Sequence, residues 1–334
     1  ASYVTVDGLT IENSGPKHQT VDAGITVRGA DNVKILRNRI RDCLFGINFE
    51  QTNRSVIEDN DITSLPVSLG LKGDGIRLWY SHGNLIRMNR TRYVRDNVFW
   101  YSSANKIYEN SGADSRYSLH FMYADRNEIL SNDYRRNSVG IFLMFSQGST
   151  LKRNFVADST GPFGIGIGMK ESSDILVEEN QILYNARGFY LDSSPYQPGT
   201  FNTFRGNEIN FNTTAFLLHG TLLPSLFESN VFKGNIEDVA NDTPESKLEI
   251  NTWRSNYWDN YEGFDRNDDG YGDIPHEQWM YADRIWSYLP AAKFFYASPV
   301  LDFMNFLWRL MPFSEPVLLA RDARPQIRER GTEK

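Results

Sequence analysis

Three consecutive lines of sequence decide the fold: NVFWYSSANKIYEN at 97–110, SLHFMYADRNEILSN at 118–132 and GIFLMFSQGSTLKRN at 140–154. Each line has an alternating apolar strand, a short polar turn, a second apolar pair and a closing Asn. The lines start 21 and 22 residues apart. A strand repeats its faces every two residues and a helix every 3.6, so this alternation excludes a helix. A strand-built repeat of this length indicates a stacked solenoid.

The opening strand of the repeat recurs along most of the chain. Its copies start at Gly24, Gly46, Gly75, Asn97, Ser118, Gly140, Gly164, Gly188 and Ala215, with a weaker copy at Asp238. The two longest steps hold extra residues at 64–72 and 194–200, which are expected to be loops on one side of a solenoid.

A second marker runs in phase with these strands. It consists of Asn38, Asn60, Asn89, Asn110, Asn132, Asn154, Asn180, Asn207 and Asn230. Asn tolerates unusual backbone angles at a bend, and its amide can bond the Asn of the next rung. The spacing therefore predicts an asparagine ladder, which is a structural feature and not a catalytic one.

Together these patterns predict an all-β fold, a right-handed parallel β-helix of about ten rungs of roughly 22 residues. We expect the β-helix at residues 1–255, an Asp/Asn-rich loop closing the rod at 256–277 and a helical tail at 278–334. Alternate positions of the opening strands form the predicted interior: Ile76, Leu78, Val98, Trp100, Leu119, Phe121, Ile141, Leu143, Ile165, Ile167, Phe189, Leu191, Phe216 and Leu218.

The same alternation predicts which side chains point outward. One column holds Trp79, Tyr101, Met122, Met144, Gly168, Asp192 and His219, and its neighbour holds Arg77, Phe99, His120, Phe142, Gly166, Tyr190 and Leu217. Exposed apolar groups of this density usually mark a partner site, although a loop folded over them is an alternative. The predicted partner-binding face consists of Arg77, Trp79, Phe99, Tyr101, Phe142 and Tyr190.

Within this face His120, Met122, Met144 and Met169 form a candidate copper site. Thioether and imidazole are soft ligands that suit Cu(I). The alternative is that the methionines fill space in the packing. Gly164, Gly166 and Gly168 are interpreted as room for a partner to approach closely.

The loop at 256–277 reads NYWDNYEGFDRNDDGYGDIPHE. Asp265, Asn267, Asp269 and Asp273 fall at the first, third, fifth and ninth positions of a calcium-type loop. The twelfth position is His276, which excludes a complete EF-hand. Weak Ca²⁺ binding and a metal-free turn braced by Asx hydrogen bonds are both open.

The tail contains an apolar helix that starts after Ser298 and Pro299, which are good helix-start residues. Its candidate docking residues are Val300, Leu301, Phe303, Met304, Phe306, Leu307, Trp308, Leu310 and Met311. The helix is about 18 Å long, too short to cross about 30 Å of hydrocarbon. It can cap the rod, but we favour docking to a membrane protein or the bilayer interface. The basic end at 321–334 is expected to be disordered.

Composition narrows the function classes. The net charge of −7 argues against a nucleic-acid partner, and the single Cys43 excludes a disulfide framework. The chain opens with Ala1 on a strand in mid-repeat, so we interpret it as a processed product or a fragment whose first rungs are missing.

The strings RYSLHFMYA at 116–124 and NYWDNYEGFDRNDDGYGDIP at 256–275, together with the rungs, resemble the NosD family of nitrous oxide reductase maturation proteins. The resemblance covers nearly the whole chain. It implies a periplasmic, membrane-associated β-helix that works with an ABC-type ATPase and permease. That assembly supports building of the copper–sulfur centre of nitrous oxide reductase, alongside a copper chaperone. The face around His120 would then meet the chaperone or the apo-reductase, and the tail would clamp the permease.

The main rival is a carbohydrate-active β-helix enzyme, either a polysaccharide lyase, hydrolase or epimerase. Fold alone cannot choose between these functions. A glycosidase needs two carboxylates facing one groove, about 5–9 Å apart. The central outward columns offer only Asp192, while Asp74 and Asp125 lie at turns without an evident partner. We therefore favour a non-enzymatic subunit; a passive adhesin or sugar-binding rod is a third alternative.

Overall fold

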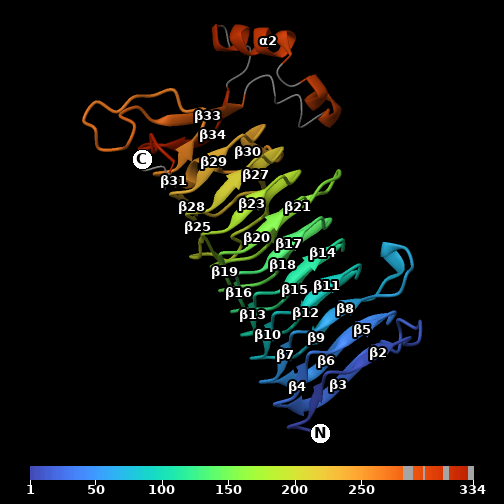
Figure 1. The fold of residues 1–334 in the computed structure, drawn as a ribbon. Coiled ribbons are helices and arrows are strands. Elements are labelled where there is room, and N and C mark those ends of the chain that lie inside the picture. The colour runs from blue at the N-terminus through green and yellow to red at the C-terminus, as the bar shows by residue number, and fades with distance from the viewer. Residues whose placement is uncertain (281–288, 296–297, 311–315, 330–334) are drawn as a thin grey trace.

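The computed structural model describes residues 1–280, 289–295, 298–310 and 316–329. Short strands wind into a right-handed solenoid in which successive turns stack along the rod axis (Figure 1). Sheets A and B are parallel along the solenoid, as is sheet C, whose ten strands confirm the predicted β-helix of about ten rungs.

Sheet A contains, in spatial order, β1 Thr5–Asp7, β4 Lys34–Leu36, β7 Val56–Glu58, β10 Leu85–Arg87, β13 Lys106–Tyr108, β16 Glu128–Leu130, β19 Thr150–Lys152, β22 Leu176–Glu178, β25 Asn202–Arg205, β28 Ser225–Glu228, β31 Thr252–Arg254, β34 Val317–Asp322 and β33 His276–Met280. Sheet B contains β2 Thr10–Glu12, β5 Arg39–Arg41, β8 Asp61–Thr63, β11 Arg90–Arg92, β14 Ser111–Ala113, β17 Asp133–Arg135, β20 Phe155–Ala157, β23 Gln181–Leu183, β26 Glu208–Asn210, β29 Val231–Lys233 and β32 Tyr257–Trp258.

Sheet C contains β3 Ala23–Asp31, β6 Phe45–Asn53, β9 Ile76–Trp79, β12 Asp96–Trp100, β15 Tyr117–Met122, β18 Val139–Met144, β21 Ile165–Lys170, β24 Arg187–Asp192, β27 Thr214–His219 and β30 Glu237–Asn241. Helical segments are the short 3₁₀ turns η1 Leu69–Leu71, η2 Leu248–Ile250 and η4 Pro290–Phe295, and the α-helix α2 Pro299–Leu310.

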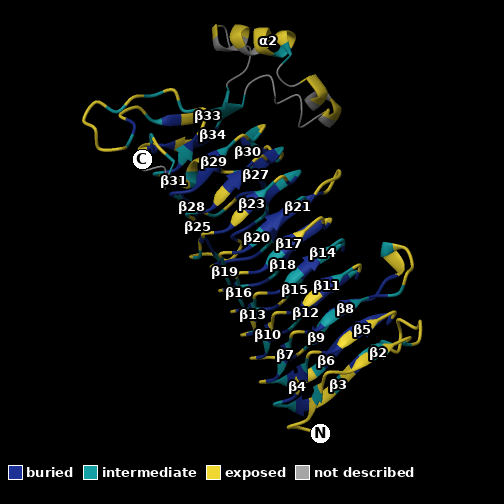
Figure 2. Ribbon diagram, viewed as in Figure 1, coloured by how far each residue is buried: buried dark blue, intermediate teal, exposed yellow. Residues whose placement is uncertain are grey.

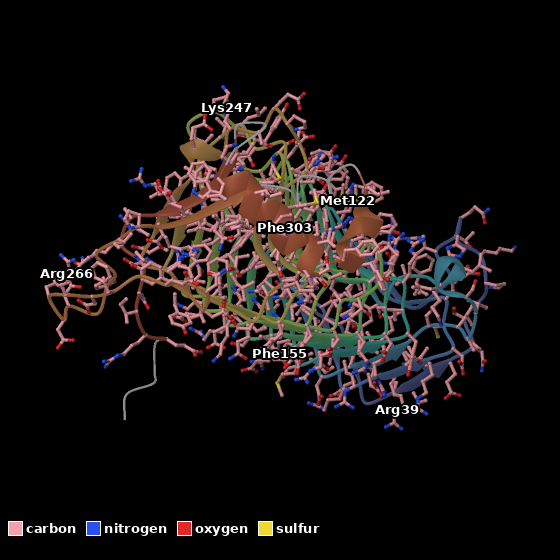
Figure 3. All side chains as sticks on the ribbon, turned by 90° about the horizontal axis from the view of Figure 1, so that it is seen from above. Arg39, Met122, Phe155, Lys247, Arg266 and Phe303 are labelled. Carbon is pink, nitrogen blue, oxygen red and sulfur yellow. The ribbon has the colours of Figure 1, made fainter. Side chains whose placement is uncertain are left out.

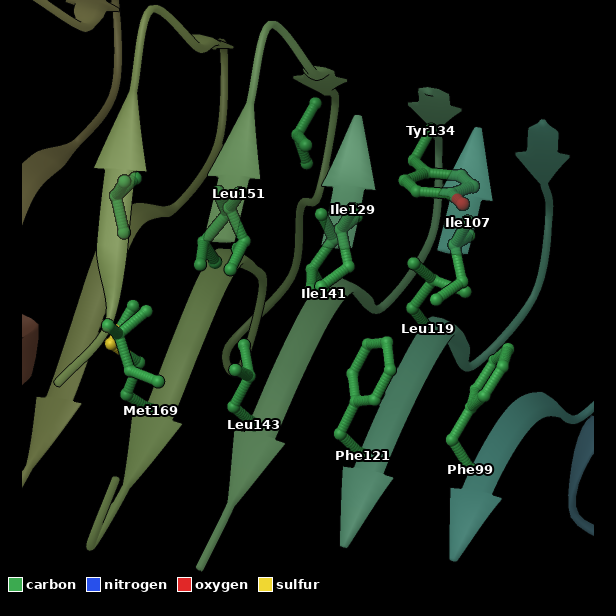
Figure 4. Close-up of a cluster of buried hydrophobic side chains, with 14 of the residues drawn as sticks. Phe99, Ile107, Leu119, Phe121, Ile129, Tyr134, Ile141, Leu143, Leu151 and Met169 are labelled. Carbon is green, nitrogen blue, oxygen red and sulfur yellow. The ribbon is translucent and has the colours of Figure 1, made fainter. Parts of the chain in front are cut away.

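The interior of the rod is a continuous column of apolar side chains. The buried residues, dark blue in Figure 2, recur on the strands along the rod. In most three-residue strands of sheets A and B the central residue points inward, as Ile107 and Ile129 do at 0 % exposure. From sheet C, Leu119 and Phe121 point into the same space (Figure 4). His120 and Met122, between and after them, are partly exposed, so the predicted alternation is confirmed for this strand.

The predicted asparagine ladder is present. Both the backbone N–H and the side-chain amide of Asn110 donate to Oδ1 of Asn132, which donates in the same way to Asn154. The strained angle at the bend lies on the residue before the ladder: Glu109 and Ser131 have φ of 53° and 55°. The Asn is thus selected for its buried amide, which satisfies backbone groups of two rungs, and not for its own backbone freedom.

The predicted phase is wrong in β12, because this strand is one residue shorter than its neighbour. Asp96 pairs with Tyr117 but Val98 pairs with His120, so the register shifts between them. Asn97 turns inward instead, and its amide donates to Thr91 Oγ1 at 2.9 Å and to the carbonyl of Ser118 at 2.8 Å. Phe99 therefore lies in the interior, whereas Val98 and Trp100 point outward.

Ile165 is a second departure from the predicted interior. It is buried, but in a small cluster on the outer side of sheet C with Val139 and Phe142. The glycines of this strand make room for the chain itself and not for a partner. A Cβ on Gly168 would lie 2.3 Å from the Phe142 ring, and one on Gly166 would lie 2.7 Å from the carbonyl oxygen of Gly188.

The C-terminal segment closes the rod. β34 adds to sheet A beside β31, and β33 pairs with β34 antiparallel. Asp322 accepts the last amide of the ladder, from Asn256 Nδ2 at 2.9 Å, and is fully buried. Residues 317–322 are thus a strand of the solenoid and not part of a disordered end. The helical segment is an excursion between β33 and β34, beyond the last rungs in Figure 1.

Candidate metal and partner-binding face

The candidate copper ligands lie on two adjacent strands of sheet C. His120 and Met122 on β15 pair with Phe142 and Met144 on β18. Nε2 of His120 lies 3.2 Å from Sδ of Met144. One metal ion with bonds of about 2.0 Å to nitrogen and 2.3 Å to sulfur could reach both atoms at this separation, with a nitrogen–metal–sulfur angle a little above 90°. Met122 is the register partner of Met144, so its thioether belongs to the same patch.

Met169 does not join this patch, which corrects its prediction as a fourth copper ligand. It pairs with Leu143 and is fully buried in the interior (Figure 4). Lys170, the next residue, is the register partner of Met144 and continues its outward column.

Two residues of the predicted partner-binding face are not exposed. Phe99 is at 0 % exposure, stacked on Phe121 with centroids 4.9 Å apart. Phe142 is 8 % exposed because its ring covers Gly168. Tyr190 is half-buried beside Phe142 in the outer cluster, and Arg77 donates to Asn48 Oδ1 at 2.8 Å.

The outward column is instead Trp79, Trp100, Met122 and Met144, which are register partners on four successive strands. All four are partly exposed. Trp79 and Trp100 meet edge to face at 4.7 Å between ring centroids. We call this column the soft face.

A second aromatic column, which pattern reasoning missed, borders the soft face. Tyr80, Tyr101, Tyr123 and Phe145 follow the strand ends and stack at centroid distances of 4.8, 5.1 and 4.8 Å. Each has a positive φ, between 46° and 53°, which is unusual for an aromatic residue. Tyr101 is thus partly exposed, but it lies in this corner stack and not in the strand column.

Buried charge lies beside the soft face. Asp74 and Asp96 are both 3 % exposed at the side chain, and Arg95 lies 3.0 Å from Asp74 and 4.0 Å from Asp96. Burial raises the pKa of Asp74 to about 6, against the attraction of Arg95. Burial alone would also raise the pKa of Asp96, but its interactions with His120 and Arg116 outweigh burial and hold that pKa below the usual range.

These contacts leave neither candidate catalytic carboxylate free. Asp74, which had no evident partner in the sequence, is tied to Arg95. Asp192 pairs with Lys170 at 3.1 Å and accepts from Ser193.

The Asp/Asn-rich loop is braced by its own side chains. Asp265 accepts from the backbone N–H groups of Asp269 and Gly270, and Arg324 donates to Asp269 at 2.9 Å. Asp273 accepts from the Arg266 N–H. Among the residues that the structure describes, no group of three His, Cys, Asp or Glu residues is placed to hold a metal ion. Calcium binding stays a prediction, and a thermal shift with Ca²⁺ would test it.

The helix α2 exposes large apolar side chains, including Phe303 at 59 % and Leu310 at 62 %. Figure 3 shows Phe303 on the helix above the end of the rod. The side chain of Trp308 and all of Met311 lie outside the described residues. Within the described ranges no helix has both the length and the hydropathy needed to cross a bilayer.

Two family models match the chain. One, described as periplasmic copper-binding protein (NosD), matches residues 63–263, and one described as right handed beta helix region matches residues 1–96. A protein of Stutzerimonas stutzeri named probable ABC transporter binding protein NosD is 27 % identical over 344 aligned positions, covering 93 % of this chain and 74 % of that protein. The protein of the same name from Pseudomonas aeruginosa is 26 % identical and covers 97 % and 78 %.

Among solved structures, the A-module of the Azotobacter vinelandii mannuronan C-5 epimerase AlgE6 is similar with a TM-score of 0.52 and 16 % identity. A variant of the periplasmic alginate epimerase AlgG has a TM-score of 0.50 and 16 % identity. The similar regions cover 67 % and 70 % of this chain, and 65 % and 62 % of the epimerase chains, just under two thirds. At this identity the likeness shows a shared β-helix fold and nothing of the chemistry.

Proposed function

The chain belongs to the NosD family, whose model covers more than half of it, and from this premise we propose that it is a non-enzymatic periplasmic subunit that carries Cu(I) on its soft face. In this role it works with an ABC-type ATPase and permease in the maturation of the copper–sulfur centre of nitrous oxide reductase. Copper is then cargo, received from a chaperone and passed to the apo-reductase.

One observation carries this proposal: the contact of His120 Nε2 with Met144 Sδ beside Met122 on an outward strand face. Imidazole and thioether together suit Cu(I). The face is only partly covered, which fits cargo that must be handed over, because structural metal sites are normally closed by four protein ligands.

Competition with a chromophoric Cu(I) chelator tests the copper site. The double variant Met122→Leu/Met144→Leu keeps apolar volume and removes both sulfur atoms. We expect its Cu(I) affinity to fall at least tenfold, about 1.4 kcal/mol. The matched control is Met169→Leu, which removes a sulfur from the interior and should leave the affinity unchanged. Equal affinities of the double variant and the wild type would remove the copper site.

The soft face and the corner stack together support a partner role. Trp79 and Trp100 lie in one column and Tyr80 and Tyr101 in the other, and aromatic side chains of this kind dominate binding energy at interfaces. We propose that this combined surface receives the copper chaperone and the apo-reductase. Because both would use the same donors, they would bind in turn.

Binding of a copper-loaded chaperone tests this surface. We expect Trp79→Glu/Trp100→Glu to weaken binding at least tenfold, because the charges would have to be desolvated against a partner. The control is Tyr184→Glu, which alters an exposed aromatic residue at another corner, stacked on Phe211. An unchanged affinity, or an equal loss in the control, would overturn the partner surface.

The excursion between β33 and β34 is proposed as the docking segment for the permease or the adjacent bilayer interface. Its exposed Phe303, Phe306 and Leu310 would be costly to leave in water. Since Met280 pairs with Val317, residues 281–316 can be replaced by a two-residue Asn-Gly turn without removing Asp322. We expect the shortened chain to keep the thermal unfolding midpoint of the wild type. We also expect that it no longer co-purifies with the permease. Retained co-purification would contradict docking through this segment.

A further inference from the structure

The ring of His120 contacts two aromatic side chains. Tyr117 stacks on it with centroids 4.6 Å apart and an interplanar angle of 17°, and Phe142 meets it edge-on at 6.5 Å. One nitrogen, Nε2, faces Met144. The other, Nδ1, is buried from solvent. It has no hydrogen-bond partner among the residues that the structure describes.

The carboxylate of Asp96 lies beside Nδ1, with Oδ2 at 3.8 Å. This carboxylate is buried. Arg116 donates two hydrogen bonds to it, one from Nε to Oδ1 at 2.9 Å and one from an Nη to Oδ2. Arg116 in turn lies over the Tyr117 ring, 5.0 Å from its centroid. Asp96, Arg116 and Tyr117 are therefore one interlocked support around the imidazole.

Two contacts compete for the proton of the neutral ring: Met144 Sδ can accept a hydrogen bond from Nε2 at 3.2 Å, and the Asp96 carboxylate lies 3.8 Å from Nδ1. A thioether is a weak acceptor, so the full negative charge is the stronger influence. A proton on Nδ1 is attracted to the Asp96 carboxylate, whereas a lone pair there would face it across a sealed gap and be repelled. A ring flip would put carbon atoms against both Asp96 and Met144, so the observed orientation is the one that uses both nitrogens.

We propose that Asp96 is a positioning residue that keeps His120 as the Nδ1–H tautomer, so that Nε2 presents its lone pair toward Met144. The copper identity of the ion that Nε2 would bind rests on the function proposed above, but the tautomer does not. A carboxylate behind a ligating histidine holds the ring and increases its basicity, and its loss typically lowers metal affinity 10- to 100-fold.

The shortened strand β12 is what places Asp96 here. Strand β12 has one residue, Asn97, where β15 has two. Asp96 therefore pairs with Tyr117, and Val98 pairs with His120. Asp96 is thus drawn toward the imidazole of the next rung. The contraction that shifts the phase of one strand therefore also builds the support of the candidate ligand.

The test is ¹⁵N NMR of the imidazole nitrogens in the metal-free protein, at a pH where His120 is neutral, with its signals assigned by their loss in His120→Gln. We expect Nδ1 to carry the proton in the wild type. In Asp96→Asn, where the charge is gone, we expect the Nε2–H form to become the major one and Cu(I) affinity to fall about tenfold. The matched control is Asp192→Asn, a carboxylate on the same face that contacts Lys170 and not His120.

The outcomes separate the two proposals. A wild-type Nε2–H tautomer overturns the role of Asp96 without any variant, even if Asp96→Asn fails to fold. An Asp96→Asn protein that keeps both the Nδ1–H form and the wild-type Cu(I) affinity also overturns it. If the wild type shows the Nδ1–H form, lost in Asp96→Asn, but binds no Cu(I), the positioning role stands and the copper function fails.

Discussion

Sheets A and C carry outer columns of the same period and opposite chemistry. On sheet A, Arg87 pairs with Glu58, Lys152 with Glu178 and Arg254 with Glu228, each across neighbouring strands. On sheet C the central rungs carry Trp79, Trp100, Met122 and Met144. Both sheets cover the same apolar interior, so the repeat constrains only the inward side chains.

Charge returns to the column of sheet C on either side of the soft face, at Glu50 before it and at Lys170 and Asp192 after it. Solvated cross-strand pairs are thus the ordinary solution for this rod. Four rungs depart from that solution, and exposed apolar columns of this kind are what the proposed binding role requires.

The largest expected effect tests where the soft face begins. Phe99→Ala should destabilise the fold by about 3–5 kcal/mol, because it empties a fully buried site. Trp100→Ala, the next residue, should cost at least about 2 kcal/mol less, since Trp100 points outward. Urea unfolding measures both. A larger loss for Trp100→Ala than for Phe99→Ala would mean that Trp100 points inward and Phe99 outward, as the sequence pattern predicted. Trp100 would then not belong to the soft face.

A buried carboxylate of sheet C, Asp238, can be compared with the solvent-exposed ion pairs of sheet A. Asp238 is buried in the last rung of sheet C, and burial raises its pKa to about 6. The folded state therefore holds a proton more tightly than the unfolded chain, whose Asp titrates near 3.8. This contribution to stability is fully present below about pH 4 and is lost as pH rises through 6.

Asp238→Asn removes that titration. We expect the free energy of unfolding of the variant, relative to wild type, to rise by about 2–3 kcal/mol between pH 4 and pH 7. Urea unfolding at a series of pH values measures the difference. The absolute stability can change as well, because Asn235, Gln278 and Asn260 all donate to the carboxylate. A pH-independent difference would contradict the shifted pKa.

A graft makes sheet C resemble sheet A. Trp100→Glu/Met122→Lys places an ion pair at two positions that are register partners. We expect a stability change within about 1 kcal/mol, because surface pairs contribute little, together with loss of Cu(I) and partner binding. Thermal unfolding and chelator competition measure the two effects. A graft that keeps its copper would show that the soft face is dispensable.

The smallest expected effect is on sheet A. Glu228→Gln removes a pair in which the Arg254 side chain is 55 % exposed. Exposed pairs contribute about 0.2–1 kcal/mol, and salt screens them. The thermal midpoint should fall slightly at low salt and match wild type at 1 M salt. A larger, salt-independent loss would mean that these pairs support the fold.

Period and alternation predicted the solenoid, the ladder and the outward His120 and Met122, because each depends on local sequence alone. The inward turn of Asn97 was beyond that rule, since it depends on acceptors at Thr91 and Ser118 supplied by other strands. Met169 was chosen for its thioether near the end of the next strand, whereas the alternation that puts Ile167 inside also puts Met169 inside.

The corner stack and the support of His120 were missed for similar reasons. Tyr101 has a left-handed backbone that strand patterns do not anticipate for an aromatic residue. Asp96 lies before the strand as read from the sequence, and only the register shift brings it near His120. The family resemblance supplied the functional class, whereas the side chains that serve it had to be located in space.

Asp322 gives the coil a direction. Each Asn side chain in the ladder donates a hydrogen bond to the ladder residue of the next rung. The carboxylate of Asp322 at the end can accept hydrogen bonds but cannot donate one. The relay stops there, and with β33 and β34 covering the same end, a second molecule meets no donor in register with which to extend the stack. The buried carboxylate of Asp322 thus ends the ladder inside the chain, beneath a rung that β34 and β33 extend.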